Sequence, residues 1–270
     1  MKHSVPKLQG KWRSASDRLE LLRAKLHNRE EITDFEWRTI FNDFKKLSEV
    51  KEFKHKSLTA LGSISAMRVK FEDYAQYMNR AGACGDSYYY ELNNVLSGFY
   101  IGDFEKAIFF RRKYLTYTGY EELLSAIAGM AQAGLFYTAS KLIEKFFYLK
   151  HQVIDEDFSV KRRGLSLRRF AMIAHTAEYF AEHKITEDLI CKRIGDAARI
   201  IVDVTKYPVT SADSGLTESG AIYQFNVEAP GDQLIDLEWA ISESACEKFD
   251  DDILSFISVG ISPFEKKGIF

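Results

Sequence analysis

Along most of this chain, apolar residues recur at steps of three and four, the spacing that places side chains on one face of a helix. The first such stripe predicts a helix from Ser14 or Ser16 to about Asn28. Thr33 and Glu36 have the spacing of a capping box and predict the start of a second helix. The same periodicity predicts later helices over 57 to about 80, about 165 to 183, 186 to about 204, 233 to 249, and 251 to 259.

One stretch interrupts this helical pattern. Residues 208–231 hold clusters of Ser, Thr, Asp and Gly, and within them Tyr223, Phe225 and Val227 alternate with other side chains. Alternation with a period of two is typical of a strand, so a short strand or ordered loop is expected there. The predicted organisation is a helical domain over 1–207, with an acidic C-terminal part over 208–270 packed on it.

The composition agrees with a predominantly helical protein. Only 4 prolines and 16 glycines occur in 270 residues, while 46% of the residues are hydrophobic and 14% aromatic. Such a chain is long and apolar enough to bury a core, and too poor in turn-forming residues for an all-β fold. The fold class predicted is all-α, with antiparallel helical hairpins and a possible short β or loop insertion near 208–231.

A short pattern occurs twice, 32 residues apart. Glycine, an aromatic two positions later and alanine three after that stand at Gly102, Phe104 and Ala107, and again from Gly134 through Phe136 to Ala139. Glycine allows a tight left-handed turn between helices, and alanine lets two helix backbones approach closely.

This repeat resembles the tetratricopeptide repeat over residues 91–150. The resemblance implies stacked helix–turn–helix units whose concave face binds a peptide, for which Tyr89, Tyr100 and Arg112 are the candidate groove residues. The period is 32 residues where the family has about 34, and the Trp and Leu-Gly positions of the first helix are missing. An ordinary antiparallel bundle is the alternative.

No sequence motif specifies a reaction. The chain has no phosphate-binding loop, dinucleotide fingerprint, nucleophile elbow or zinc-protease motif, so a non-enzymatic protein without a cofactor is expected. His175, Glu178 and Glu182 share a helix face, but a metal would need a second set of ligands, and a solvated helix surface is the preferred interpretation. A metal-dependent helical enzyme remains an alternative.

Charge is distributed unevenly. From Lys206 onward there are four Lys/Arg and twelve Asp/Glu, a net charge of −8, so the rest carries +6 within the total of −2. The densest basic cluster is Lys161 to Arg163 with Arg168 and Arg169. Near-neutral total charge argues against a dedicated nucleic-acid binder. The cluster is therefore expected to be a solvated loop or an intramolecular partner of the acidic part, although RNA binding is an alternative.

The three cysteines are widely separated, and the N-terminus lacks the apolar run of a signal peptide. No membrane-spanning run is present either, which leads us to expect a cytoplasmic protein with reduced cysteines. Size, predicted helicity and the acidic C-terminal part are similar to those of all-helical immunity proteins of bacterial polymorphic toxin systems. The resemblance implies that the protein occludes a toxin with a basic surface.

In that interpretation the acidic side chains of the C-terminal part are the electrostatic contacts, and two aromatics are loop anchors. The residues are Asp236, Glu238, Glu243, Glu247, Asp250, Asp251, Asp252, Tyr223 and Phe225. The alternative partner interaction is that of a tetratricopeptide-like adaptor or chaperone scaffold binding a peptide or protein.

Overall fold

The structure is a computed structural model that describes residues 5–85, 87–150 and 166–264. It is mostly helical with a small three-stranded sheet, which confirms the predicted all-α class with a short β insertion. The chain divides into two compact units at the Ser97–Gly98 junction, which lies inside α5 (Tyr88–Tyr100). None of the described helices combines the length and the apolar run needed to cross a bilayer.

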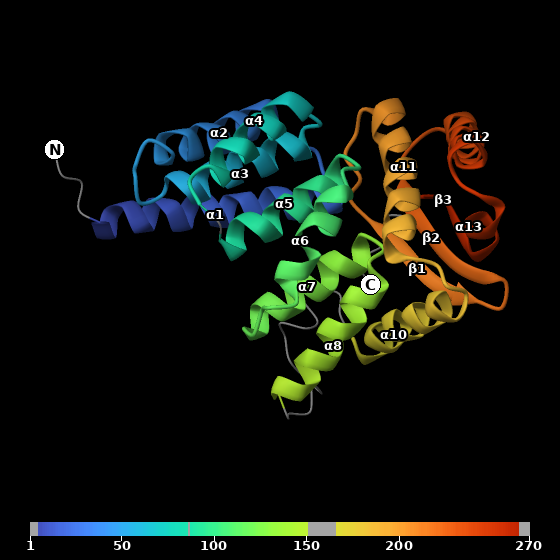
Figure 1. The fold of residues 1–270 in the computed structure, drawn as a ribbon. Helices are drawn as coiled ribbons and strands as arrows, with labels where there is room; N and C mark the ends of the chain where they lie inside the picture. The colour runs from blue at the N-terminus through green and yellow to red at the C-terminus, as the bar shows by residue number, and fades with distance from the viewer. Residues whose placement is uncertain (1–4, 86, 151–165, 265–270) are drawn as a thin grey trace, which may run out of the picture. The chain divides into compact units, whose positions relative to one another are not determined.

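Unit 1 is a group of helices built around α3 (Lys54–Met67), which is buried from its second turn onward. Its elements are α1 (Val5–His27), α2 (Asp34–Leu47), α3 (Lys54–Met67), α4 (Phe71–Gly82) and the first part of α5 (Figure 1). All side chains of α3 from Ser57 to Met67 are buried. Because many of them are small, neighbouring helices approach α3 closely: at Gly62 an added Cβ would lie 3.0 Å from Met78 of α4.

Two predicted helix starts have different outcomes. Thr33 caps α2 as expected: its side chain accepts a hydrogen bond from Glu36 N, and the Glu36 carboxylate accepts one from Thr33 N at 2.9 Å. The predicted start of the first helix at Ser14 or Ser16 is wrong, because α1 already begins at Val5. Its additional turns carry Trp12, whose ring packs 5.4 Å from that of Phe44.

The described residues of unit 2 run from Gly98 to Lys150 and from Ser166 to Phe264. Its helices after α5 are α6 (Glu105–Tyr114), α7 (Tyr120–Gln132), α8 (Phe136–Lys150), α10 (Leu167–Glu182), α11 (Glu187–Thr205), α12 (Gly231–Lys248) and α13 (Asp251–Phe256). The strands are β1 (Ala212–Thr217), β2 (Gly220–Val227) and β3 (Ile257–Pro263). Figure 1 shows α11 running beside the sheet. Along the chain, β1 and β2 follow α11, and α12, α13 and β3 come after them.

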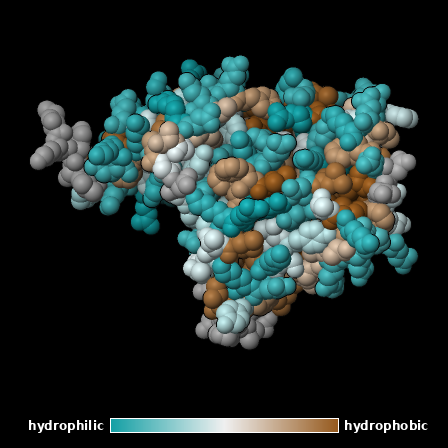
Figure 2. Space-filling view, in the orientation of Figure 1, coloured by the Kyte–Doolittle hydropathy of each residue, from teal (hydrophilic) through white to brown (hydrophobic). Residues whose placement is uncertain are grey.

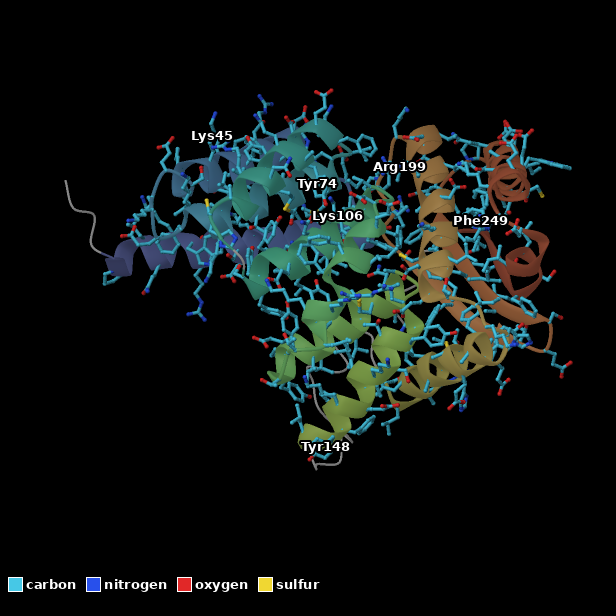
Figure 3. The ribbon with its side chains drawn as sticks, in the orientation of Figure 1. Lys45, Tyr74, Lys106, Tyr148, Arg199 and Phe249 are labelled. Atoms are coloured by element: carbon cyan, nitrogen blue, oxygen red, sulfur yellow. The ribbon has the colours of Figure 1, made fainter. Side chains whose placement is uncertain are left out.

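The two repeated glycines make equivalent turns. Gly102 has φ 72° and Gly134 has φ 77°, both in the left-handed region that favours glycine. Helix α11 packs against both turns, since an added Cβ would lie 2.7 Å from Arg199 N at Gly102 and 2.5 Å from Ile194 Cδ1 at Gly134. Lys106 and Arg199, labelled in Figure 3, mark α6 and α11 near the first turn.

The start of α11 is held by a polar cluster from two other helices. Glu187 accepts hydrogen bonds from Thr138 N at 3.0 Å and Thr138 Oγ1 at 2.7 Å. Arg111 of α6 forms ion pairs with Asp188 and, at 3.5 Å, with Glu187. These contacts fix α11 across the ends of α6 and α8.

The sheet is more extensive than the sequence predicted. β1 and β2 form an antiparallel hairpin, and β3 joins β2 in parallel, with Tyr223 opposite Val259 and Phe225 opposite Ile261. The predicted helix over 251–259 is therefore wrong over its last three residues, because α13 ends at Phe256 and β3 begins at Ile257. Residues 257–259 have a helical sequence pattern but form a strand instead, because pairing with β2 buries Ile257 and Val259.

Candidate functional site

The two predicted loop anchors lie in the core of unit 2. Tyr223 is 2% exposed and Phe225 is fully buried. The Tyr223 hydroxyl donates a 2.5 Å hydrogen bond to the carbonyl of Gln132, and burial raises the pKa of this phenol. Since both rings point into the interior from β2, we correct their assignment from partner contacts to core residues.

The alternative groove residues do not present a common set of exposed rings. Tyr100 is buried, and Tyr89 is half-buried with its ring 6.1 Å from that of Trp12 in unit 1. Arg112 is exposed on α6. The buried Tyr100 ring is unavailable to a peptide, so that part of the predicted groove is wrong.

The candidate metal-binding trio lies on the solvent side of α10. His175, Glu178 and Glu182 are all exposed. Within the described ranges, no three His, Cys, Asp or Glu side chains are grouped closely enough to hold a metal ion. Of the basic cluster, Lys161 to Arg163 lie outside the described residues.

Helix α12 has two apolar faces. Leu237, Ile241 and Ala245 are buried at intervals of four residues and attach the helix to unit 2. Ile235 and Trp239 lie on another side and remain 60% and 72% exposed. A surface helix normally has a single apolar face, so the second one is a candidate for binding.

The second apolar face borders a groove between α12 and β3. The groove encloses about 410 Å³ and is mainly apolar; its lining residues are Leu234, Ile235, Glu238, Trp239, Ser242, Ile261 and Pro263. In Figure 2, hydrophobic residues gather over the position of β2 and β3, next to the mainly hydrophilic surface over α12. An indole beside such a groove offers a large apolar contact area.

Acidic side chains form a row beside the exposed apolar face. At about 100° per residue, Asp232, Asp236, Glu243 and Glu247 fall within a sector of roughly 60°, adjacent to that of Trp239. All four are exposed, and no lysine or arginine of the described chain forms an ion pair with them. We call these four residues the acidic row.

The remaining predicted acidic contacts have different positions. Glu238 is half-buried, and its carboxylate accepts a 2.7 Å hydrogen bond from Ile261 N, so it serves the fold of β3. Asp250 is exposed just after α12. Asp251 and Asp252 begin α13, but their side chains lie outside what the structure describes.

The only lysine of α12 is already engaged. Lys248 Nζ lies 2.5 Å from Asp196 Oδ1 of α11, and Ser244 donates a 2.8 Å hydrogen bond to the other oxygen of that carboxylate. The five acidic residues of α12 are therefore offset by one cation that is directed at another helix. This surface carries a negative potential that favours a basic partner.

A buried arginine of α11 contacts β3 and the residue that follows α12. Arg193 of α11 is 4% exposed, and its guanidinium lies 5.7 Å from the centre of the Phe249 ring, the residue labelled in Figure 3. Its Nη2 donates a 3.4 Å hydrogen bond to Val259 O. Burial lowers the pKa of Arg193. Arg193 thus links α11 to β3 and to the residue that follows α12.

Comparison with protein-family models, with curated proteins and with solved structures found no match.

The sequence analysis missed Ile235 and Trp239, although a signal for them was present. In the sequence of α12, Leu237, Ile241 and Ala245 form one helical stripe, and Ile235 and Trp239 each lie about 160° around the helix from Leu237. Separating the two stripes predicts two apolar faces. No sequence signal indicated that Ile261 and Pro263 line the groove, because their position there depends on where β3 lies.

Proposed function

We propose that this chain is a non-enzymatic binding protein that occludes a basic surface of a partner protein, in the way an immunity protein neutralises its toxin. The observation that carries the proposal is the exposed apolar face of α12, with Trp239 at its centre and the acidic row beside it. The partner contact is assigned to this helix and to the adjoining groove.

In this proposal the apolar groups supply most of the binding energy, and the charged groups set the association rate and the choice of partner. Tryptophan is enriched among the residues that dominate binding energy, because a large ring fills a pocket and excludes water. Acidic side chains around such an anchor accelerate encounter with a basic partner and disfavour acidic ones. Because the acidic row forms no ion pair within the described chain, its carboxylates are available for such a partner.

The test combines partner identification with matched charge reversals. The wild-type full chain is used to capture cross-linked partners from cells that naturally make it, and binding of each purified candidate is then measured. The test variant is Asp236→Lys, Glu243→Lys, Glu247→Lys. The control is Glu178→Lys, Glu182→Lys, Glu144→Lys, which reverses three exposed carboxylates of the same unit on other helices.

We expect the α12 reversal to weaken binding by about 100-fold and the control by less than about threefold. The partner's own activity should be blocked at a one-to-one ratio by wild type and control. Equal binding by the two triple variants would contradict the proposed surface. A partner that binds but keeps full activity would contradict occlusion.

A further inference from the structure

The exposed apolar face of α12, defined by Ile235 and Trp239, continues along the helix as a stripe with two small side chains, Ser242 and Cys246. Ile235, Trp239, Ser242 and Cys246 follow one another at intervals of four, three and four residues, and the last three are also exposed. From Ile235 to Cys246 this stripe is about 16 Å long, the length of three helical turns. The acidic row runs parallel to it along the same helix.

The edge of β3 that faces away from β2 is blocked to an added strand. Glu238 already accepts the hydrogen bond of Ile261 N, and Arg193 donates to Val259 O. Pro263, at the end of the strand, has no N–H to offer. An extended peptide that adds a strand must hydrogen-bond to the free backbone N–H and C=O groups of this edge. Since these groups are already bonded or missing, the groove favours an occupant that binds through its side chains.

We infer that the occupant is a basic amphipathic helix of the partner, about three to four turns long, lying along α12. This inference rests on the proposed function and names the partner element. Apolar residues of the helix at i, i+4 and i+7 enter the groove beside Trp239, and its lysines or arginines face the acidic row. The apolar stripe determines where the partner helix lies, and the acidic row favours a partner helix with basic side chains.

The probes are four fluorescent 18-residue peptides, and binding to the full chain is followed by fluorescence anisotropy. The first is made of Lys and Leu with the leucines at helical spacing, and the second has the same composition in strict alternation. The third replaces the leucines of the first by Ala, and the fourth replaces its lysines by Glu. The protein variants are Trp239→Ser and Asp236→Lys, Glu243→Lys, with Glu178→Lys, Glu182→Lys as control.

We expect the helical Lys/Leu peptide to bind wild type about tenfold more tightly than each of the other three. Trp239→Ser and the α12 reversal should each lower its affinity about tenfold, while the α10 control should leave it unchanged. An alternating peptide that binds as tightly as the helical one would overturn the inference. So would helical-peptide binding that is unchanged in both α12 variants.

Self-association is a further outcome, measured by sedimentation equilibrium of the full chain. A dimer that Trp239→Ser dissociates would overturn the inference, because a second copy would then cover the stripe. The proposed function is judged separately from partner capture. If partner capture depends on α12 but the helical peptide does not bind, the proposed function stands and the inference of a helical partner is wrong. If partner capture is unchanged by the α12 substitutions, the proposed function itself is wrong.

Discussion

At the scale of single residues, Gly102 and Gly134 share a left-handed backbone conformation but meet different parts of α11. Both have positive φ, which costs an L-residue about 1–2 kcal/mol. At Gly102 an added Cβ meets the backbone of α11, with Ala198 C at 2.9 Å, whereas at Gly134 it first meets the end of the Ile194 side chain. A side-chain end can move, and a helix backbone moves only with the whole helix.

Gly102→Ala should therefore lower the free energy of unfolding by more than about 3 kcal/mol, and Gly134→Ala by about 1–2 kcal/mol. Urea denaturation followed by circular dichroism measures both. Gly215→Ala in β1, where an added Cβ meets nothing within 4 Å, is the control and should change little. Equal losses at Gly102 and Gly134 would contradict the assigned role of the α11 backbone.

A second residue-scale prediction concerns acid stability of unit 1. Hydrogen bonds from Lys25 and from the Thr33 backbone lower the pKa of Glu36 from 4.5 to about 2. Since the folded-state pKa is below the unfolded one, Glu36 contributes stability above about pH 4.5 that disappears as the pH falls toward 2. Wild type should thus lose stability more steeply than Glu36→Gln over this interval, as measured by thermal unfolding. Glu31→Gln, an exposed carboxylate outside the capping box, should retain the wild-type slope.

At the scale of elements, β3 depends on a side chain of α12. Glu238→Ala leaves the N–H of Ile261 without its acceptor, which should destabilise unit 2 by about 1–3 kcal/mol. Glu238→Gln keeps a carbonyl oxygen that can accept the same bond and should cost less. Amide exchange of Ile261 by NMR should be faster in the alanine variant, while Glu243→Ala, in the exposed acidic row, should leave it unchanged. Unchanged exchange in Glu238→Ala would show that the bond does not protect this edge.

At the scale of the whole molecule, the uneven charge distribution affects how fast a basic partner arrives. Charge reversal in the acidic row should mainly lower the association rate, whereas Trp239→Ser should mainly raise the dissociation rate. Stopped-flow or surface-based kinetics with the captured partner separates the two. Raising salt from about 50 to 500 mM should slow association of wild type several-fold, because it screens exposed charges. A salt-independent association rate would argue against steering by this surface.

Local sequence patterns were enough to predict most helices, the capping box at Thr33, the two glycine turns and the acidic residues on α12. These follow from short-range physics: periodicity, caps and φ preferences act within a few residues of one another. The sequence did not determine that Tyr223 and Phe225 are buried, or that Ile257 to Pro263 form a strand beside β2. Nor did it show that Glu238 bonds to β3 while Ile235 and Trp239 stay uncovered. A periodic pattern shows which residues share a face, whereas only the tertiary structure decides which faces other elements cover, because that depends on contacts between distant segments.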